Sequence, residues 1–215
     1  MVERQRDRDR RTLLRMAERH HPDYTSDVEL VYEIGSRPGE DRVRELRTIM
    51  PKTPVPFVVL RPSIPDPPAD PVSFEDVEFD IRKERGHECS IQHIVVEDAP
   101  ASLRYLICFS PSITRRFSWS IQYVMPRLWD PFRLEGEDRM TWTVMNWDGF
   151  TPPRSHITNL RVSFIVSQSF PGCLVERVGS LGNLTGPMQL DDGRRYFQWD
   201  CENPDPVRYE WRVIR

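Results

Sequence analysis

The sequence lacks the features that mark membrane segments and secretion signals. No run of about 18 consecutive apolar residues occurs anywhere in the chain. The opening stretch, MVERQRDRDRRTLLRM, is charged and has no apolar core of the kind a secretion signal needs. We therefore expect no contact with membranes and a cytoplasmic location.

Paired cysteines and recognisable catalytic motifs are also absent from the sequence. The four cysteines are widely spaced and form no CxxC pair, which argues against a zinc ribbon or a redox motif. Ser110 in FSPS and Ser180 in GSLG lack the G-x-S-x-G pattern of a nucleophile, and GSLGNLTG lacks the lysine of a phosphate loop. We predict reduced, mostly buried thiols, no catalytic residue and no cofactor. The cysteines are Cys89, Cys108, Cys173 and Cys201.

Lysine is scarce, and there is no excess of positive charge. Of the 30 basic residues only Lys52 and Lys83 are lysines, a bias typical of GC-rich, actinobacterium-like genomes. The formal net charge of -3 argues against a whole-domain surface for nucleic acid or for an anionic membrane. Any contact of that kind would have to be local.

Large apolar residues are plentiful, and their spacing indicates strands. Ten Phe, six Trp and six Tyr within 215 residues are enough to build the core of one large all-β domain. Apolar and polar residues alternate with period two, as in half-buried antiparallel strands. The sequence therefore predicts an all-β fold, an antiparallel immunoglobulin-like β-sandwich with a short N-terminal amphipathic helix. The expected strands are 27–35, 42–50, 56–65, 77–82, 103–109, 117–123, 140–144, 160–166 and 207–213.

Some of these strands carry more specific expectations. The stretch 42–50 has the propensity for a helix as well, but the extended PKTPVP that follows favours a strand. Prolines should confine the strand within 56–65 to a sheet edge or a strand end. LRYLICF, residues 103–109, is apolar on both faces and suits a central strand. In the last strand, Val207 is expected to face inward together with alternate residues up to Val213.

The N-terminal residues 1–24 are predicted to form a helical extension of a sandwich that spans 25–215. Leu13, Leu14 and Ala17, with Met16 nearby, lie along one side of a short helix that Pro22 ends. This helix must pack either on its own sandwich or on a partner. The run PDPPADP, residues 65–71, is expected to be an internal linker. Whether 25–64 and 72–215 form one sandwich or two subdomains stays open at this point.

His87, Cys89 and His93 in RGHECSIQHIVVE are the most suggestive candidates for a metal site. On a strand they would share one face, but with Cα atoms ~6.5 to 7 Å apart per step, too spread to converge on one tetrahedral ion. We favour a sheet face with a hydrogen-bonded histidine. A metal-dependent enzyme remains the alternative, provided that His156 or a carboxylate from another strand lies opposite.

Three further clusters have structural interpretations that we favour. His20 and His21 suit the C-terminal end of a helix. Asp191, Asp192 and Gly193 suit a hairpin turn better than a calcium loop. The N-terminal arginines alternate with acids and suit a solvated, ion-paired helix, with a nucleic-acid arm as the alternative. These arginines are Arg4, Arg6, Arg8, Arg10 and Arg11.

One longer signature resembles a known group of proteins. FSWSIQYVMPRLWDPFRLEGEDRMTWTV, with TPVPFVVLRP, NLRVSFIVSQSFPG and RRYFQWDCENPDPVRYEWRV, resembles uncharacterised β-sandwich modules of actinobacterial proteins, found alone or beside helix-turn-helix or effector domains. The resemblance covers the chain from about Asp27 onward and implies a recognition module. We expect a non-enzymatic protein-interaction or sensing module of a bacterial regulatory or signalling system. Its protein partner could dock on the helix at Thr12–Arg19.

Overall fold

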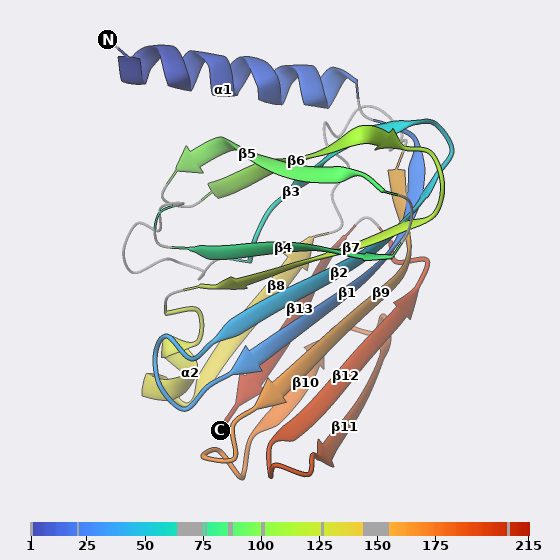
Figure 1. Cartoon of the computed structure of the whole chain (residues 1–215). Helices are drawn as coiled ribbons and strands as arrows, with labels where there is room; N and C mark the ends of the chain where they lie inside the picture. Colours follow the sequence, from blue (N-terminus) through green and yellow to red (C-terminus); the bar gives the residue numbers. More distant parts are fainter. Residues whose placement is uncertain are drawn as a thin grey trace.

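The computed structural model of the chain describes residues 2–20, 22–63, 75, 77–85, 88–99, 102–125, 127–143, 155–205 and 207–215 (Figure 1). The predicted linker 65–71, together with His21, His87 and Val144, lies outside these residues. None of the described helices is long and apolar enough to cross a membrane.

Strands dominate the described chain, and the predicted all-β class with an N-terminal helix is confirmed. The helices are α1 (Val2–Arg19) and the one-and-a-half-turn α2 (Asp130–Glu135). Helix α1 is therefore longer than its predicted apolar part, because charged residues continue it towards the N-terminus. The strands are β1 (Tyr24–Ile34), β2 (Arg42–Pro51), β3 (Val55–Leu60), β4 (Glu78–Arg85), β5 (Ser90–Ala99), β6 (Ser102–Ile113), β7 (Phe117–Val124), β8 (Glu137–Thr143), β9 (Ser155–Val166), β10 (Leu174–Val178), β11 (Asn183–Gln189), β12 (Arg195–Glu202) and β13 (Arg208–Ile214).

The strands form one large sheet and two small ones. The large sheet has seven strands in the order β11-β12-β9-β1-β2-β7-β4, and the three-stranded sheets have the orders β10-β13-β8 and β3-β6-β5. Strands β1 and β9 pair in parallel, which corrects the expectation of a wholly antiparallel fold. Alternation in a sequence shows which face of a strand is buried, but not the direction of its neighbour.

Both small sheets pack against one face of the large sheet. The main core lies between the large sheet and the two small sheets. Phe79 of β4 stacks on Tyr105 of β6 with ring centroids 4.5 Å apart. At the other half, Trp199 of β12 meets Trp211 of β13 edge-on at 5.1 Å. Figure 1 shows β8, β10 and β13 behind the large sheet and β3, β5 and β6 above it. Strands from before and after the Pro-rich run share these sheets, since β1 and β2 lie between β9 and β7.

Most of the specific strand predictions hold. The stretch 42–50 is strand β2, paired with β1 and β7, and not a helix. Strand β3 lies at an edge and β6 at the centre of their sheet, as the prolines and the doubly apolar LRYLICF predicted. The prediction that Val207 faces inward is wrong. Val207 precedes β13 and is 41% exposed, whereas Trp211 within the strand is 1% exposed.

Helix α1 packs on its own protein, across the outer face of the sheet β3-β6-β5 (Figure 1). Ala17 and the half-buried Leu14 join Val96 and Leu106 in a second apolar cluster separate from the main core. Met16 stays 54% exposed and lies outside this contact. Of the two docking alternatives that the sequence left open, the structure shows the intramolecular one.

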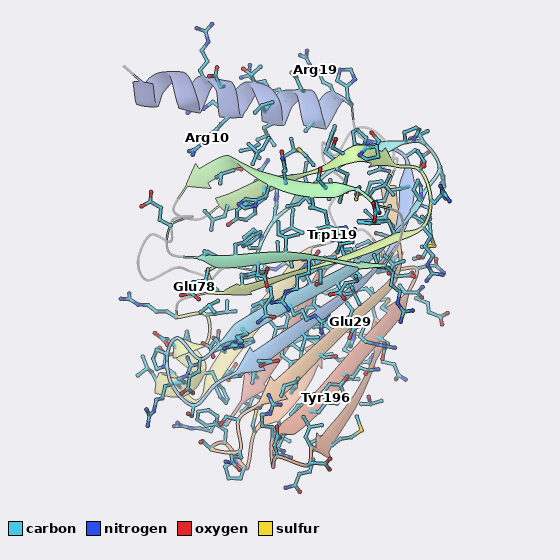
Figure 2. The ribbon with its side chains drawn as sticks, in the orientation of Figure 1. Arg10, Arg19, Glu29, Glu78, Trp119 and Tyr196 are labelled. Atoms are coloured by element: carbon cyan, nitrogen blue, oxygen red, sulfur yellow. The ribbon has the colours of Figure 1, made fainter. Side chains whose placement is uncertain are left out.

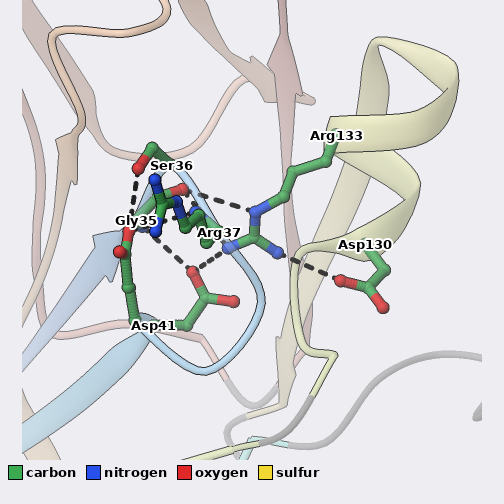
Figure 3. Close-up of polar contacts among 7 residues, drawn as sticks. Gly35, Ser36, Arg37, Asp41, Asp130 and Arg133 are labelled. Atoms are coloured by element: carbon green, nitrogen blue, oxygen red, sulfur yellow. Dashed lines mark hydrogen bonds and ion pairs between the residues drawn. The ribbon is translucent and has the colours of Figure 1, made fainter.

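A buried ion pair fastens α2 to the turn between β1 and β2 (Figure 3). Arg133 of α2 pairs with Asp41, whose side chain is almost wholly buried, and donates to the carbonyl of Gly35 and, at 3.1 Å, to Asp130 Oδ1. Burial raises the pKa of Asp41, although Arg133 opposes the shift. These contacts are architectural, since they link α2 to the turn between two strands of the large sheet.

Candidate binding groove

The outer face of the large sheet, opposite the small sheets, carries a groove of about 420 Å³. Strands β12, β9, β1 and β2 form it. In β1 alternate residues such as Val28 and Leu30 are buried in the core, so the residues between them point to this outer face. The polar side chains that line the groove include Asp27, Glu29, Thr48, Arg161, Asp200 and Glu202.

The strand register arranges these side chains in rows that cross the sheet. Asp200 of β12 pairs with Arg161 of β9, which pairs with Glu29 and then with Leu46 of β2. Glu29 on β1 is visible in Figure 2. Because neighbouring strands are ~4.8 Å apart, each row brings together side chains that are far apart in the sequence. The next row consists of Glu202, Asn159, Asp27 and Thr48.

A β-bulge between β1 and β9 fixes the position of Asp27. The parallel register shifts between Ser26 and Asp27, which leaves Thr158 as the extra residue of β9. Thr158 Oγ1 and Asn159 Nδ2 each donate to Asp27 Oδ1 at 2.7 Å. The carboxylate is therefore held in place at the floor of the groove.

A second set of hydrogen bonds fixes the other side of the groove. Arg161 Nε donates to Asp200 Oδ1 at 2.7 Å, and Gln198 Nε2 donates to Asp200 Oδ2 at 2.6 Å. Tyr196 OH donates to Gln198 Oε1 at 2.5 Å, which extends the chain of bonds along β12. The bond to Asp200 raises the pKa of Arg161. The arrangement is suited to binding, because its polar groups are already oriented before a ligand arrives.

The groove is negatively charged. Among the described residues that line it, four are carboxylates and one, Arg161, is a base. Arg161 is already bound to Asp200, so it does not neutralise Asp27 or Glu202. Such a surface favours cationic groups over anionic ones.

The predicted histidine and cysteine row is only partly present. Strand β4 ends at Arg85 and β5 begins at Ser90, so a single strand through His87, Cys89 and His93 is wrong, and His87 lies outside the described residues. Cys89 packs against the main core, and burial raises the pKa of its thiol.

His93 makes aromatic contacts with residues of β4 and β6. Its ring lies 5.6 Å from the ring of Phe79 and 6.4 Å from that of Tyr105, measured between centroids. His156 pairs with Thr25 in the large sheet, whereas His93 belongs to the sheet β3-β6-β5. Within the described ranges, no three His, Cys, Asp or Glu residues gather as metal ligands would.

Two other predicted clusters are structural. Asp192 and Gly193 form the turn between β11 and β12, where Arg194 N donates to Asp192 Oδ1 at 3.0 Å, which confirms the hairpin interpretation. His20 N donates to the carbonyl of Met16 at 3.0 Å at the end of α1, while His21 lies outside the described residues.

Of the five N-terminal arginines, Arg8, Arg10 and Arg11 have described side chains. Arg10 is half-buried on the side of α1 that faces the sheet, as Figure 2 shows. Arg8 and Arg11 are exposed, and the side chains of Arg4 and Arg6 lie outside the described set. Among the described side chains, Arg10 therefore differs in exposure from Arg8 and Arg11, and the nucleic-acid alternative stays a prediction.

The groove residues were not predicted as a site. The period-two pattern of 27–35 predicts a strand with one solvated face, but nothing in the sequence marks Arg161, Asp200 or Glu202 as neighbours of that face. The signal that would have found them is the strand order β12-β9-β1-β2, which places three distant segments side by side.

No protein-family model matches the chain, and no curated protein matches it. Solved structures that it resembles include the M1 zinc metallopeptidase from Deinococcus radiodurans, at 14% identity and a TM-score of 0.40, covering 89% of this chain and 42% of that one. A mutant of that enzyme with a Tyr-Ser-Ala substrate has the same identity and coverage and a TM-score of 0.41. A two-domain M1 mutant with L-tryptophan matches over 91% and 43% of the two chains, at 14% identity and a TM-score of 0.41. The chain thus spans less than half of these structures, and a likeness this low carries neither fold nor activity over.

Proposed function

We propose that this chain is a non-enzymatic protein-binding module and that the groove on the large sheet is its binding surface. The observation that carries the proposal is the pre-oriented polar floor, in which Asp27 and Asp200 are each held by two hydrogen bonds. Rigid, satisfied polar groups on an open sheet face suit recognition of another chain, because little entropy is lost on binding. A cytoplasmic location and a role in regulation or signalling remain predictions from the sequence.

The dimensions of the groove favour an extended segment of a partner. Four strands at ~4.8 Å spacing span about 14 Å, a distance that about four residues of extended chain cover at ~3.3 Å each. The negative charge of the lining favours a segment with Arg or Lys side chains. Asp27 and Glu202 lie in one row on either side of β9, about 10 Å apart, and would contact two basic side chains of such a segment.

The proposal is tested with a labelled peptide of alternating Arg and Ser, and with its Glu-Ser counterpart. Fluorescence anisotropy should show saturable binding of the basic peptide that weakens with salt. The double variant Asp27→Asn/Glu202→Gln should weaken it about tenfold, which corresponds to about 1.4 kcal/mol.

The matched control changes the same charge elsewhere. Glu78→Gln/Asp191→Asn removes two exposed carboxylates that do not line the groove. Equal weakening in this control, or equal binding of the Glu-Ser peptide, would show that no groove-specific recognition exists. Sedimentation of the unliganded chain tests self-association. If the chain forms oligomers and the groove variant is monomeric, the occupant of the groove is a second copy of this chain and not a partner segment.

The exposed flank of α1 is a second surface through which a protein partner could dock. Leu13 and Met16 are 36% and 54% exposed, beside the residues that hold the helix on its sheet. Methionine adapts easily to differently shaped partners. Leu13→Ser/Met16→Ser should abolish binding of a partner identified by crosslinking, whereas Leu174→Ser, at a residue of β10 that is 47% exposed, should not.

A further inference from the structure

We propose that a second, separate site lies between β10, β13 and the loop that joins β10 to β11, and that it binds a single aromatic or branched apolar group bearing a carboxylate. The cavity there has a volume of about 250 Å³. Pockets for drug-sized ligands measure ~300 to 1,000 Å³, so this one suits a ligand the size of one large side chain. The site goes beyond the proposed protein-binding function and does not depend on it.

The floor of the cavity is aromatic. Trp199, Tyr209 and Trp211 line it, with centroids 5.2 Å apart for Trp199 and Tyr209 and 5.1 Å apart for Trp199 and Trp211. All three side chains are almost wholly buried, at 1%, 5% and 1% exposed, and they close the cavity from below. The base of the cavity is therefore apolar, which favours an apolar occupant such as an aromatic or branched group.

The rim is apolar and open to solvent. Val178 and Leu181 line the cavity and are 48% and 44% exposed. Large exposed apolar side chains above an aromatic floor leave apolar surface in water that a ligand would cover. Burial of this rim is therefore a driving force for binding.

The loop that carries the rim is held in a fixed shape. Trp199 Nε1 donates to the carbonyl of Leu181 at 3.2 Å. Gly182 lies flat on the same indole with φ +73°, and a Cβ there would come within 2.2 Å of the ring. The cavity is thus preformed, which lowers the entropic cost of occupying it.

The charges at the mouth favour an anion. Arg177 and Arg208 line the cavity with Glu210. Arg177 Nη1 donates to the carbonyl of Ser180 at 3.1 Å, which keeps its guanidinium at the loop. Glu210 lies 3.5 Å from Arg139 and is partly compensated by it. A carboxylate on the ligand would meet the net positive charge of the two arginines.

Two sources share this chemistry, namely a free aromatic acid and the C-terminal residue of a peptide. The full chain is titrated with phenylpropionate, phenylpropanol and propionate, and with a Gly-Gly-Phe peptide whose C-terminus is free or amidated. The readout is the NMR resonance of the Trp199 indole N–H, assigned with Trp199→Phe. Phenylpropionate should shift it saturably, phenylpropanol should bind about tenfold more weakly, and propionate should have no effect.

Variants separate the two parts of the site. Arg208→Gln should remove the preference for the acid over the alcohol, and Leu181→Ser should weaken both by about tenfold. Met188→Ser, an exposed apolar residue of β11 outside the cavity, should change neither. If the Gly-Gly-Phe peptide with a free C-terminus binds more tightly than phenylpropionate, the natural ligand is a chain terminus. If phenylpropionate binds more tightly than this peptide, the natural ligand is a small aromatic acid. Absence of a saturable shift with every probe, or equal affinity for acid and alcohol, overturns the proposal.

Discussion

The two three-stranded sheets cover the same face of the large sheet, but their outer faces have opposite chemistry. In the sheet β3-β6-β5 the outer face is apolar, and α1 lies on it through Ala17 and Leu14. In the sheet β10-β13-β8 the outer face is charged, with Arg212 of the central strand between Glu137 and Glu176. The apolar outer residues of the first sheet are Phe57, Val59, Val96, Leu106 and Cys108.

The difference between the two outer faces follows from the central strand of each small sheet, which determines whether a further layer covers that sheet. Strand β6 is apolar on both faces, so it needs the large sheet on one side and a helix on the other. Strand β13 alternates, with Tyr209, Trp211 and Val213 buried and the charged Glu210 and Arg212 between them. Its outer face can therefore remain in contact with solvent. Helix α1 is thus a third layer required by β6.

The largest expected effect tests whether the inner faces of the two sheets are equivalent. Phe109 of β6 and Trp211 of β13 are 4% and 1% exposed, and each contacts rings of the large sheet. Phe109→Ala and Trp211→Ala should each lower the free energy of unfolding by about 3 to 5 kcal/mol. Urea denaturation measures both. A loss of less than about 1 kcal/mol in one of them would show that this sheet does not share the core.

The next prediction concerns the outer face beneath α1. Leu106 is 6% exposed and packs with Ala17 and Val96. Leu106→Ala should cost about 2 to 4 kcal/mol, because it leaves a cavity between helix and sheet. The matched change on the uncovered sheet is Thr141→Ala, which should cost under about 0.5 kcal/mol. Equal losses at the two positions would mean that α1 does not bury this face.

The alternation of buried and exposed residues also explains which strands could be predicted from the sequence. The period-two patterns located most strands because burial of one face is written in consecutive residues. The stretch 42–50 was ambiguous for a physical reason: two of its inward positions hold Glu45 and Arg47, an ion pair whose carboxylate side is 2% exposed. Charges on the buried face erase the alternation on which strand prediction depends.

The candidate sites were harder to predict, because both depend on pairing between distant segments. Asp27 meets Asn159 only because β9 runs parallel to β1, and Trp199 meets Trp211 only because two sheets face each other. The spacing of His87, Cys89 and His93 suggested a single strand face. In the structure β4 ends before this stretch and β5 begins within it, at Ser90. The spacing of residues in the sequence predicts which of them share a strand face. The strand order and the packing of the sheets determine which other residues that face contacts.

A pH-dependent prediction applies to the inner face of the sheet β10-β13-β8. Burial raises the pKa of Asp138 from 3.8 to about 6. The folded state then binds a proton more tightly than the unfolded chain, so the free energy of unfolding falls as pH rises from about 4 through about 6. The loss should be about 1 to 2 kcal/mol after allowance for solvent screening.

Asp138→Asn should flatten this part of the pH profile in urea denaturation series. Burial also raises the pKa of Asp41, so a residual slope of the same sign should remain. Glu137→Gln on the outer face is the control, since the hydrogen bond from Arg212 lowers the pKa of Glu137 and moves its effect to more acidic pH. An unchanged slope in Asp138→Asn would assign the effect to another group.

The smallest effect is expected on the charged outer face itself. Arg212 Nε donates to Glu137 Oε1 at 2.9 Å, and its Nη1 lies 3.4 Å from Glu176 Oε2. These pairs are exposed to solvent, so Arg212→Gln should lower the free energy of unfolding far less than Leu106→Ala does. The cost should shrink as salt rises, whereas that of Leu106→Ala should not, because salt screens charges but does not fill a cavity. A salt-independent loss as large as that of Leu106→Ala would mean that Arg212 contributes through packing, and that this outer face is less different from the helix-covered one than its charges indicate.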